Sequence, residues 1–120
     1  MNIATVTIYV DDQERSLQFW LNLGFELIEK KPMTNKHFWI EVAPKNAQTR
    51  LVLYPKELME DYSERKASII FQCNVDKKYE YYKQKGVKFI EEPKQMPWGK
   101  FATFEDIDGN QFLLKDAKTN

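Results

Sequence analysis

The sequence predicts an α+β fold built from two tandem β-α-β-β-β modules, residues 2–55 and 67–116, joined by a connector at 56–66. Three observations support this prediction. A run of alternating apolar residues is followed by a run of apolar residues at helical spacing. The same order of elements returns in the second half of the chain. Each expected helix stops at a glycine, Gly24 in the first module and Gly86 in the second.

The first module begins with the strand "ATVTIYV" at residues 4–10, in which apolar and polar side chains alternate. Asp11 or Asp12 can then cap the helix "QERSLQFWLNL", whose apolar residues recur at helical spacing. Three further strands follow: "FELIEKKPM", "HFWIEVAP" and "RLVLYP". These segments complete one β-α-β-β-β unit.

The second module repeats this order, starting from the strand "SIIFQCNV", which we expect to end at Val75. Asp76 is the expected cap of the helix "KKYEYYKQK", and the strands "VKFIEEPKQM", "KFATFEDI" and "QFLLKD" follow. The connector is rich in charge and reads as a solvated segment, with room for one short helix that uses Leu58, Met59 and Tyr62.

Composition excludes several classes of function. Eighteen basic residues balance eighteen acidic residues, so the net charge gives no argument for binding nucleic acid. Cys73 is the single cysteine, which rules out an internal disulfide and a cysteine-based zinc motif. No apolar run approaches the roughly 20 residues that span a bilayer. We therefore expect a soluble cytoplasmic protein with no membrane partner.

The order of elements and two longer segments resemble a known family. The opening "VDDQERSLQFWLNLGFE" and the close "QMPWGKFATFEDIDGNQF" look like those of the vicinal oxygen chelate superfamily, which includes glyoxalase I, bleomycin-resistance proteins, fosfomycin-resistance enzymes and extradiol dioxygenases. The resemblance covers nearly the whole chain. It implies that the modules form a U-shaped sheet around a pocket, and that the protein is a homodimer.

The resemblance also locates the positions at which metal enzymes of this family take their ligands, one from the first strand and one from the last strand of each module. Those positions carry Thr5, Val52, Ile70 and Leu113. A catalytic divalent ion prefers imidazole or carboxylate ligands, usually at least three of them. These four residues supply one hydroxyl, so we expect no metal and no other cofactor, and a divalent ion is disfavoured.

Strand alternation then assigns side chains to the two faces of each sheet. The face opposite the helices is predicted to bind a ligand through Tyr9, Trp39, Glu41, Arg50, Tyr54, Gln72, Trp98 and Phe101. A planar or cationic group stacked between the two tryptophans fits such a set. Alternatives remain for these residues: Trp39 and Phe101 suit a filled core or a dimer interface, Trp98 suits a turn anchor, and Glu41 and Arg50 suit an ion pair.

His37 is the only histidine. It suits a surface position after the loop "TNK", a general base, or a displaced metal site with Glu41 and Glu105. On an extended strand His37 and Glu41 would lie about 13 Å apart, which is too far for both to bind one ion directly.

These observations favour a metal-free small-molecule-binding protein of the bleomycin-resistance type, which sequesters an aromatic or amphipathic compound, for example in antibiotic resistance. The alternative is a glyoxalase-like lyase, isomerase or thiol transferase that holds a divalent metal at shifted ligands such as His37, Glu41 or Glu105. A third reading is a closed pocket and a role as an interaction partner through the dimer surface. The sequence identifies no catalytic residue and no particular ligand.

Overall fold

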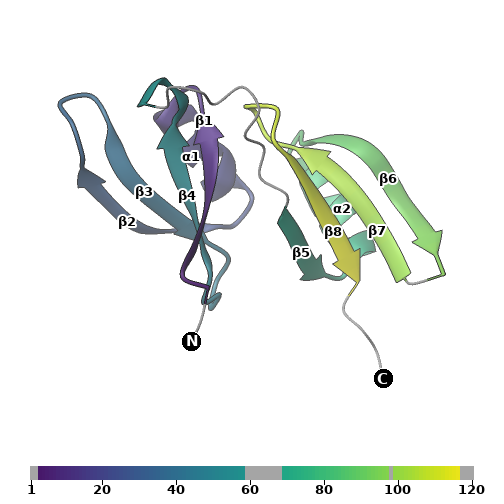
Figure 1. The fold of residues 1–120 in the computed structure, drawn as a ribbon. Helices are drawn as coiled ribbons and strands as arrows, with labels where there is room; N and C mark the ends of the chain where they lie inside the picture. The colour runs from purple at the N-terminus through teal and green to yellow at the C-terminus, as the bar shows by residue number, and fades with distance from the viewer. Residues whose placement is uncertain (1–2, 59–68, 98, 117–120) are drawn as a thin grey trace. The chain divides into compact units, whose positions relative to one another are not determined.

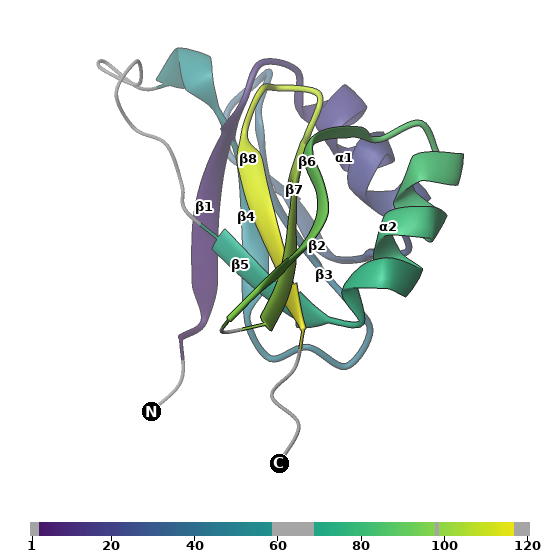
Figure 2. The ribbon, with the colours of Figure 1, turned by 90° about the vertical axis from the view of Figure 1, so that its right-hand side faces the viewer.

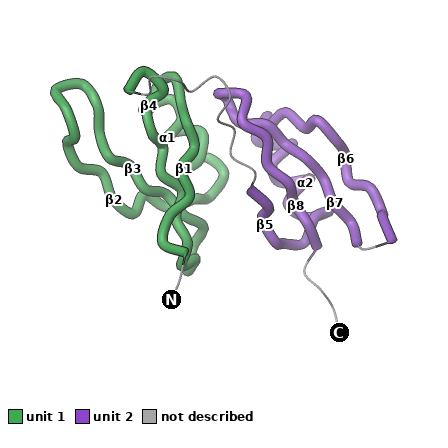
Figure 3. The backbone as a smooth tube through the Cα atoms, in the orientation of Figure 1, with its two compact units in different colours: residues 1–67 green, residues 68–120 purple. Residues whose placement is uncertain are grey.

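The computed structural model describes residues 3–58, 69–97 and 99–116. The chain divides into two compact units, Met1–Ala67 and Ser68–Asn120 (Figure 3). Unit 1 contains β1 (Thr5–Val10), α1 (Gln13–Asn22), β2 (Glu26–Pro32), β3 (Phe38–Ala43), β4 (Arg50–Pro55) and a 3₁₀ turn, η1 (Lys56–Leu58). Unit 2 contains β5 (Ile69–Cys73), α2 (Val75–Gln84), β6 (Lys88–Met96), β7 (Gly99–Glu105) and β8 (Gln111–Asp116). The predicted α+β fold with two tandem β-α-β-β-β modules is confirmed.

Each unit holds one four-stranded mixed sheet (Figure 1). The strand order is β1-β4-β3-β2 in unit 1 and β5-β8-β7-β6 in unit 2. The first strand of each unit pairs in parallel with the last strand, and the other pairs are antiparallel. A parallel pair needs a long crossover between its strands, and here the crossover is the helix with the two strands that follow it.

In each unit the helix lies against one face of its own sheet (Figure 2). The side chains that alternation assigned to this face are buried in unit 1 at Ile8, Val10, Ile40, Val42, Leu51 and Leu53. Their counterparts in unit 2 are buried at Ala102, Phe104, Phe112 and Leu114. Trp20 of α1 and Tyr82 of α2 complete the two cores. This apolar burial is the main source of stability for each unit.

Both helices start at a side-chain cap and end at a glycine. Asp12 accepts a hydrogen bond from the Arg15 amide at 3.0 Å, which selects one of the two predicted caps. Asn74 caps α2 by accepting a bond from the Lys77 amide at 3.1 Å. Gly24 and Gly86 then adopt positive φ, which glycine tolerates better than other residues.

Two predictions at the start of α2 were wrong. Asp76 is not the cap, and Val75 does not end the preceding strand, because it is the first residue of α2. Pairing between β5 and β8 stops at Cys73, so the chain turns into the helix earlier than expected. Asn is as good a helix cap as Asp, so the early end of the pairing between β5 and β8 places the helix start at Asn74.

The strand registers correct one further prediction, the equivalence of Thr5 and Ile70. Thr7 lies opposite Val52 in unit 1, and Ile70 lies opposite Leu113 in unit 2. Ile70 therefore corresponds to Thr7. The residue that would correspond to Thr5 lies outside the described residues.

The "DIDGN" turn between β7 and β8 is fixed by Asp106, which is buried. Its Oδ1 accepts bonds from the amides of Asp108 and Asn110, both at 2.9 Å. Its Oδ2 accepts a bond from the Asn110 side chain at 3.0 Å. Gly109 has a φ of 84°, a conformation that glycine adopts readily in a turn.

At the junction of β3 and β4 the sheet of unit 1 opens. These strands pair in register only at Glu41 with Val52 and Val42 with Leu51. Beyond that point the Gln13 side chain bridges them. Its amide nitrogen donates to the Phe38 and Leu53 carbonyls at 2.6 and 2.8 Å, and its oxygen accepts from the Phe38 amide at 3.0 Å.

Of the predicted connector, only the turn η1 lies within the described residues. The expected short helix falls mostly on 59–66, which the structure does not describe. Among the described residues, no helix is both long and apolar enough to cross a membrane.

Candidate functional site

Three of the predicted ligand-binding residues come together on the face of unit 1 opposite α1. Glu41 on β3 is only 7 % exposed. The Trp39 indole nitrogen donates to Glu41 Oε2 at 2.7 Å, and Arg50 Nη1 donates to Glu41 Oε1 at 3.0 Å. Trp39 precedes Glu41 by two residues on the same strand, and Arg50 begins the neighbouring strand, so alternation places all three on one face.

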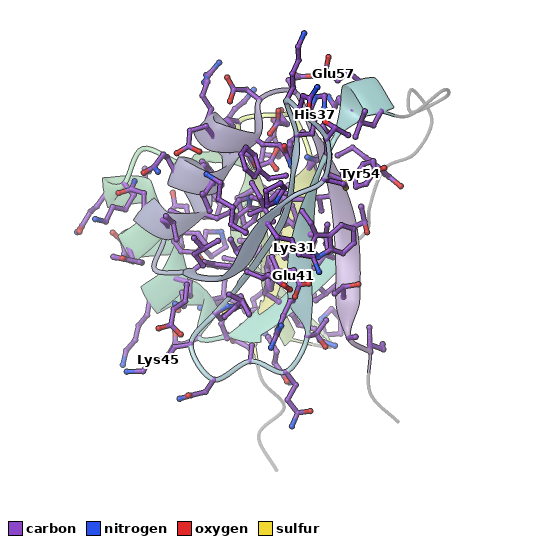
Figure 4. The ribbon with its side chains drawn as sticks, turned by 90° about the vertical axis from the view of Figure 1, so that its left-hand side faces the viewer. Lys31, His37, Glu41, Lys45, Tyr54 and Glu57 are labelled. Carbon is purple, nitrogen blue, oxygen red and sulfur yellow. The ribbon has the colours of Figure 1, made fainter. Side chains whose placement is uncertain are left out.

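These contacts keep Glu41 ionised. The hydrogen bond from Trp39 makes the largest contribution to lowering the pKa of the Glu41 carboxyl, and the hydrogen bond and positive charge of Arg50 and the charge of Lys31 act in the same direction. Burial opposes them, because it disfavours the charged form. Figure 4 shows Lys31 beside Glu41 on this face. With an acceptor bond at each oxygen, Glu41 is a structural carboxylate and is poorly suited to act as a general base.

Two further predicted residues meet on the same face. Tyr9 and Tyr54 are directly opposite each other on β1 and β4. Their ring centroids are 6.2 Å apart and the rings are nearly perpendicular, at 84°, which is a favourable edge-to-face contact. Val52, between Arg50 and Tyr54 on β4, is fully buried. Along this face, Val52 therefore separates the aromatic pair of Tyr9 and Tyr54 from the hydrogen-bonded group of Trp39, Glu41 and Arg50.

The other predicted residues belong to unit 2 or are not described. Phe101 on β7 is half-buried and lies opposite Lys115 of β8. Gln72 on β5 is exposed and also lies opposite Lys115. Trp98 is outside the described residues, so neither its predicted ligand contact nor the turn-anchor alternative is tested. The stacking of a ligand between Trp39 and Trp98 likewise stays a prediction.

The four positions that the family uses for metal ligands do not fit a catalytic ion in this chain. Val52 is fully buried and Leu113 is half-buried, and neither has a donor atom. Thr5 offers one neutral hydroxyl, and Ile70 offers no donor atom. No residue of this set is an imidazole or a carboxylate, the ligands that such sites require.

His37 lies at another place in unit 1. Its Nε2 contacts the carboxylate of Glu57, and its Nδ1 lies 3.0 Å from the Thr34 hydroxyl. Figure 4 shows the His37–Glu57 pair well separated from Glu41. The His37 side chain is only 13 % exposed, less than expected for a surface histidine. Within the described ranges, no three His, Cys, Asp or Glu side chains are grouped to hold an ion, so the displaced site with Glu41 and Glu105 is not observed.

A cavity of about 320 Å³ lies beside His37 near the start of α1, and no sequence pattern predicted it. Its charged lining residues are Asp11, Asp12, Glu14, Lys36, His37 and Glu57. Its four carboxylates are already engaged, by Lys56, the α1 backbone, Lys30 and His37 respectively. The cavity is therefore a polar surface hollow in which each of these carboxylates already has a partner.

Cys73 is half-buried on β5. Burial raises the pKa of its thiol and outweighs the opposing charge of Lys78, and the charge of Asp116 makes a smaller contribution in the same direction as burial. A thiol kept protonated is a poor nucleophile.

A sequence model of the Glyoxalase/Bleomycin resistance protein/Dioxygenase superfamily matches residues 2–114. The chain belongs to this superfamily. Among its relatives, the uncharacterized protein YetH of Bacillus subtilis (strain 168) is 49 % identical over 116 residues, which is 95 % of this chain and 97 % of YetH.

Solved structures of this superfamily share the fold. A member from Sphaerobacter thermophilus DSM 20745 has a TM-score of 0.88 and 32 % identity, with 98 % of both chains covered. TnmS3 from Streptomyces sp. CB03234, described as an antibiotic binding protein, has a TM-score of 0.83 and 30 % identity, with 98 % of this chain and 97 % of TnmS3 covered. The resemblance inferred from the two sequence segments is thus confirmed at the level of the superfamily.

Proposed function

We propose that this protein binds a small aromatic or amphipathic compound without using a metal ion. The observation that carries this proposal is the exchange of residue types on one sheet face of unit 1. The resemblance to the superfamily assigns two metal-ligand positions to Thr5 and Val52, and aromatic side chains stand on the same face at Tyr9, Trp39 and Tyr54.

The chemistry of this face suits a planar ligand. Aromatic side chains bind flat apolar molecules through their rings, and the indole of Trp39 is held in one orientation by its bond to Glu41. A ring with a fixed orientation loses little conformational freedom when a ligand stacks on it. Similarity to TnmS3, an antibiotic binding protein at 30 % identity, supports the same class of function.

The proposal includes Gln72, Phe101 and Trp98 of the second module as further ligand contacts. It also includes a homodimer in the cytoplasm, which the resemblance to the superfamily implies. Sequestration of an antibiotic or a toxic metabolite is the physiological role that such binding would serve.

Calorimetric titration tests the binding step. We expect members of a panel of naphthalene, anthracene, acridine and anthraquinone derivatives to bind, and we expect Trp39→Ala and Trp98→Ala to weaken that binding about tenfold or more. Phe38→Ala is the matched control, because Phe38 is adjacent to Trp39 and alternation places it on the opposite face. Absence of binding by every compound would overturn the proposal.

Metal analysis tests the second part of the proposal, that binding uses no metal ion. The protein would be purified after growth with added Ni²⁺, Zn²⁺ and Mn²⁺ and assayed for bound metal before and after treatment with a chelator. We expect less than a stoichiometric amount of each ion. One chelator-removable ion per chain would overturn the metal-free part of the proposal and favour the lyase or isomerase alternative.

A further inference from the structure

The ion pair between Glu41 and Arg50 is asymmetric in its exposure to solvent. The Glu41 side chain is 10 % exposed, whereas the Arg50 side chain is 43 % exposed. An approaching molecule therefore meets the guanidinium and not the carboxylate. The group that this pair presents outward is positive.

Arg50 has donors to spare. Its guanidinium carries five N–H groups, and among the described residues it makes one hydrogen bond, from Nη1 to Glu41 Oε1. The backbone of Arg50 is also fixed, because its amide donates to the Ala4 carbonyl at 3.0 Å. The side chain is thus oriented at one nitrogen and retains outward donors that can bind an oxygen anion in the bidentate manner typical of arginine.

Glu41, in contrast, has no place for a ligand cation. Both of its oxygens already accept hydrogen bonds, one from Trp39 and one from Arg50. With its side chain only 10 % exposed, the carboxylate is largely out of reach of a cationic ligand. This argues against the cationic ligand that the two tryptophans alone suggested.

We propose that the ligand is an aromatic acid, a planar ring system with a carboxylate or ionised phenol, whose anionic oxygen is bound by Arg50 while its ring packs on Trp39. This inference rests on the proposed function and specifies its ligand class. The geometry supports it because the same Glu41 carboxylate holds the indole and the guanidinium, which makes the aromatic surface and the anion-binding group neighbours. Lys31, also close to Glu41, carries a second positive charge on this part of the face and pairs with Glu29 at 3.4 Å.

Matched probe pairs test the ligand class. The two members of each pair share one ring system and differ in charge. The pairs are 2-naphthoate with 2-naphthamide, anthracene-2-carboxylate with its amide, and anthraquinone-2-carboxylate with its amide. We expect the acid of a binding pair to bind at least tenfold more tightly than the amide. We expect Arg50→Gln to remove that preference by weakening the binding of the acid much more than the binding of the amide.

Arg15→Gln is the matched control, because Arg15 is an exposed arginine on α1 and should leave every affinity unchanged. The double variant Arg50→Gln with Glu41→Gln removes both charges together. It therefore shows whether an effect of Arg50→Gln comes from the loss of the anion-binding group or from leaving the Glu41 carboxylate without its partner. It should show the same loss of acid preference as Arg50→Gln. Far-ultraviolet circular dichroism would establish that each variant is folded.

The outcomes are distinguishable. Amides that bind as tightly as acids, or an acid preference that survives Arg50→Gln, would overturn the aromatic-acid proposal and leave the proposed function standing. Failure of all acids and amides to bind would overturn both. An acid preference that disappears in Arg50→Gln and persists in Arg15→Gln would support both.

Discussion

Units 1 and 2 share one architecture and differ in the chemistry of one sheet face. Their strand order is the same. Each also has a register shift at an equivalent place: between Leu27 and Glu29 in the pairing of β2 with β3, and between Phe89 and Glu91 in the pairing of β6 with β7. Glu41 lies opposite Val52, and its counterpart Thr103 lies opposite Leu113. The two modules are therefore comparable position by position.

The helix-facing sides are equivalent in character, since both are closely packed and apolar. The opposite sides are not. Unit 1 has Trp39, Glu41 and Arg50 where unit 2 has Phe101, Thr103 and Gln111. In unit 2, Thr103 donates to Glu91 Oε1 at 3.2 Å, a neutral hydroxyl in place of an ion pair. The helix-facing side therefore maintains the fold in both units, whereas the opposite side differs in its chemistry from one unit to the other.

The sheets also differ at one seam. In unit 2, β7 and β8 pair continuously from Phe101 with Lys115 to Glu105 with Gln111. In unit 1, pairing between β3 and β4 is short, and Gln13 of α1 bridges the opening. The residue at the same helix position in unit 2 is Val75, a fully buried apolar side chain. A polar side chain thus replaces backbone pairing in one module and is unnecessary in the other.

The largest expected effect is on the cores. Trp20→Ala in unit 1 and Tyr82→Ala in unit 2 remove side chains at equivalent helix positions, each almost fully buried. Each should lower the free energy of unfolding by about 3–5 kcal/mol, the usual cost of truncating a large buried aromatic residue. Urea denaturation followed by circular dichroism measures it. A loss below 1 kcal/mol in either variant would contradict the equivalence of the two cores.

The second effect concerns the Glu41–Arg50 ion pair of unit 1, whose counterpart positions in unit 2 are Thr103 and Gln111. Glu41→Gln keeps an oxygen to accept from Trp39 and removes the charge that faces Arg50. We expect a loss of about 1.5–3 kcal/mol, the range for hydrogen bonds to charged groups. Thr103→Val in unit 2 is the comparison variant and should cost less.

This pair also predicts a dependence on pH. The pKa of Glu41 is lower in the folded protein than its ordinary value of 4.5, so the unfolded chain binds the proton more readily. The stabilisation is complete above that ordinary pKa and is lost as the pH falls through the lower folded value. Urea midpoints measured from pH 7 down to pH 3 should fall less steeply in Glu41→Gln than in the wild type. Parallel curves would show that Glu41 does not carry this effect.

Gln13→Ala tests the seam and should cost about 1–2 kcal/mol, because it removes several partly exposed hydrogen bonds. Hydrogen exchange of the Phe38 amide should accelerate, while exchange along β7 and β8 should not change. Unaltered protection at Phe38 would mean that the backbone closes the seam without Gln13.

The smallest expected effects are at the helix caps. Asp12→Ala and Asn74→Ala each remove one bond to a helix-start amide, and each should cost about 1 kcal/mol. Asp76→Ala separates the observed cap from the one that the sequence suggested, and it should cost clearly less than Asn74→Ala. The reverse order would place the cap at Asp76.

Periodicity and turn signals predicted the fold because they depend on near neighbours in the sequence. Alternation identified the buried side of β3 and β7, and the glycine at each helix end identified the C-terminus of both helices. The start of α2 was wrong because Asn74 and Asp76 are both good caps, and only the end of pairing at Cys73 decides between them.

The candidate site could be predicted only in part. Alternation predicted that Trp39, Glu41 and Arg50 lie on one face. The structure adds that one Glu41 oxygen accepts a hydrogen bond from Trp39 and the other accepts one from Arg50. The contacts of His37 with Glu57 and of Gln13 with Leu53 have no local signal, because they join residues 20 and 40 positions apart. Contacts of this kind depend on how the strands are brought together and not on any short pattern.

The bridge made by Gln13 has a consequence for the order of folding. Its bonds join residues that are 25 and 40 positions apart in the chain, whereas the turns of α1 and the β2–β3 hairpin are local. Contacts between distant residues close large loops and form after local ones in most small domains. We therefore expect α1 and the hairpin to form first, and the closing of the β3–β4 seam by a single glutamine to be among the last events in the folding of unit 1.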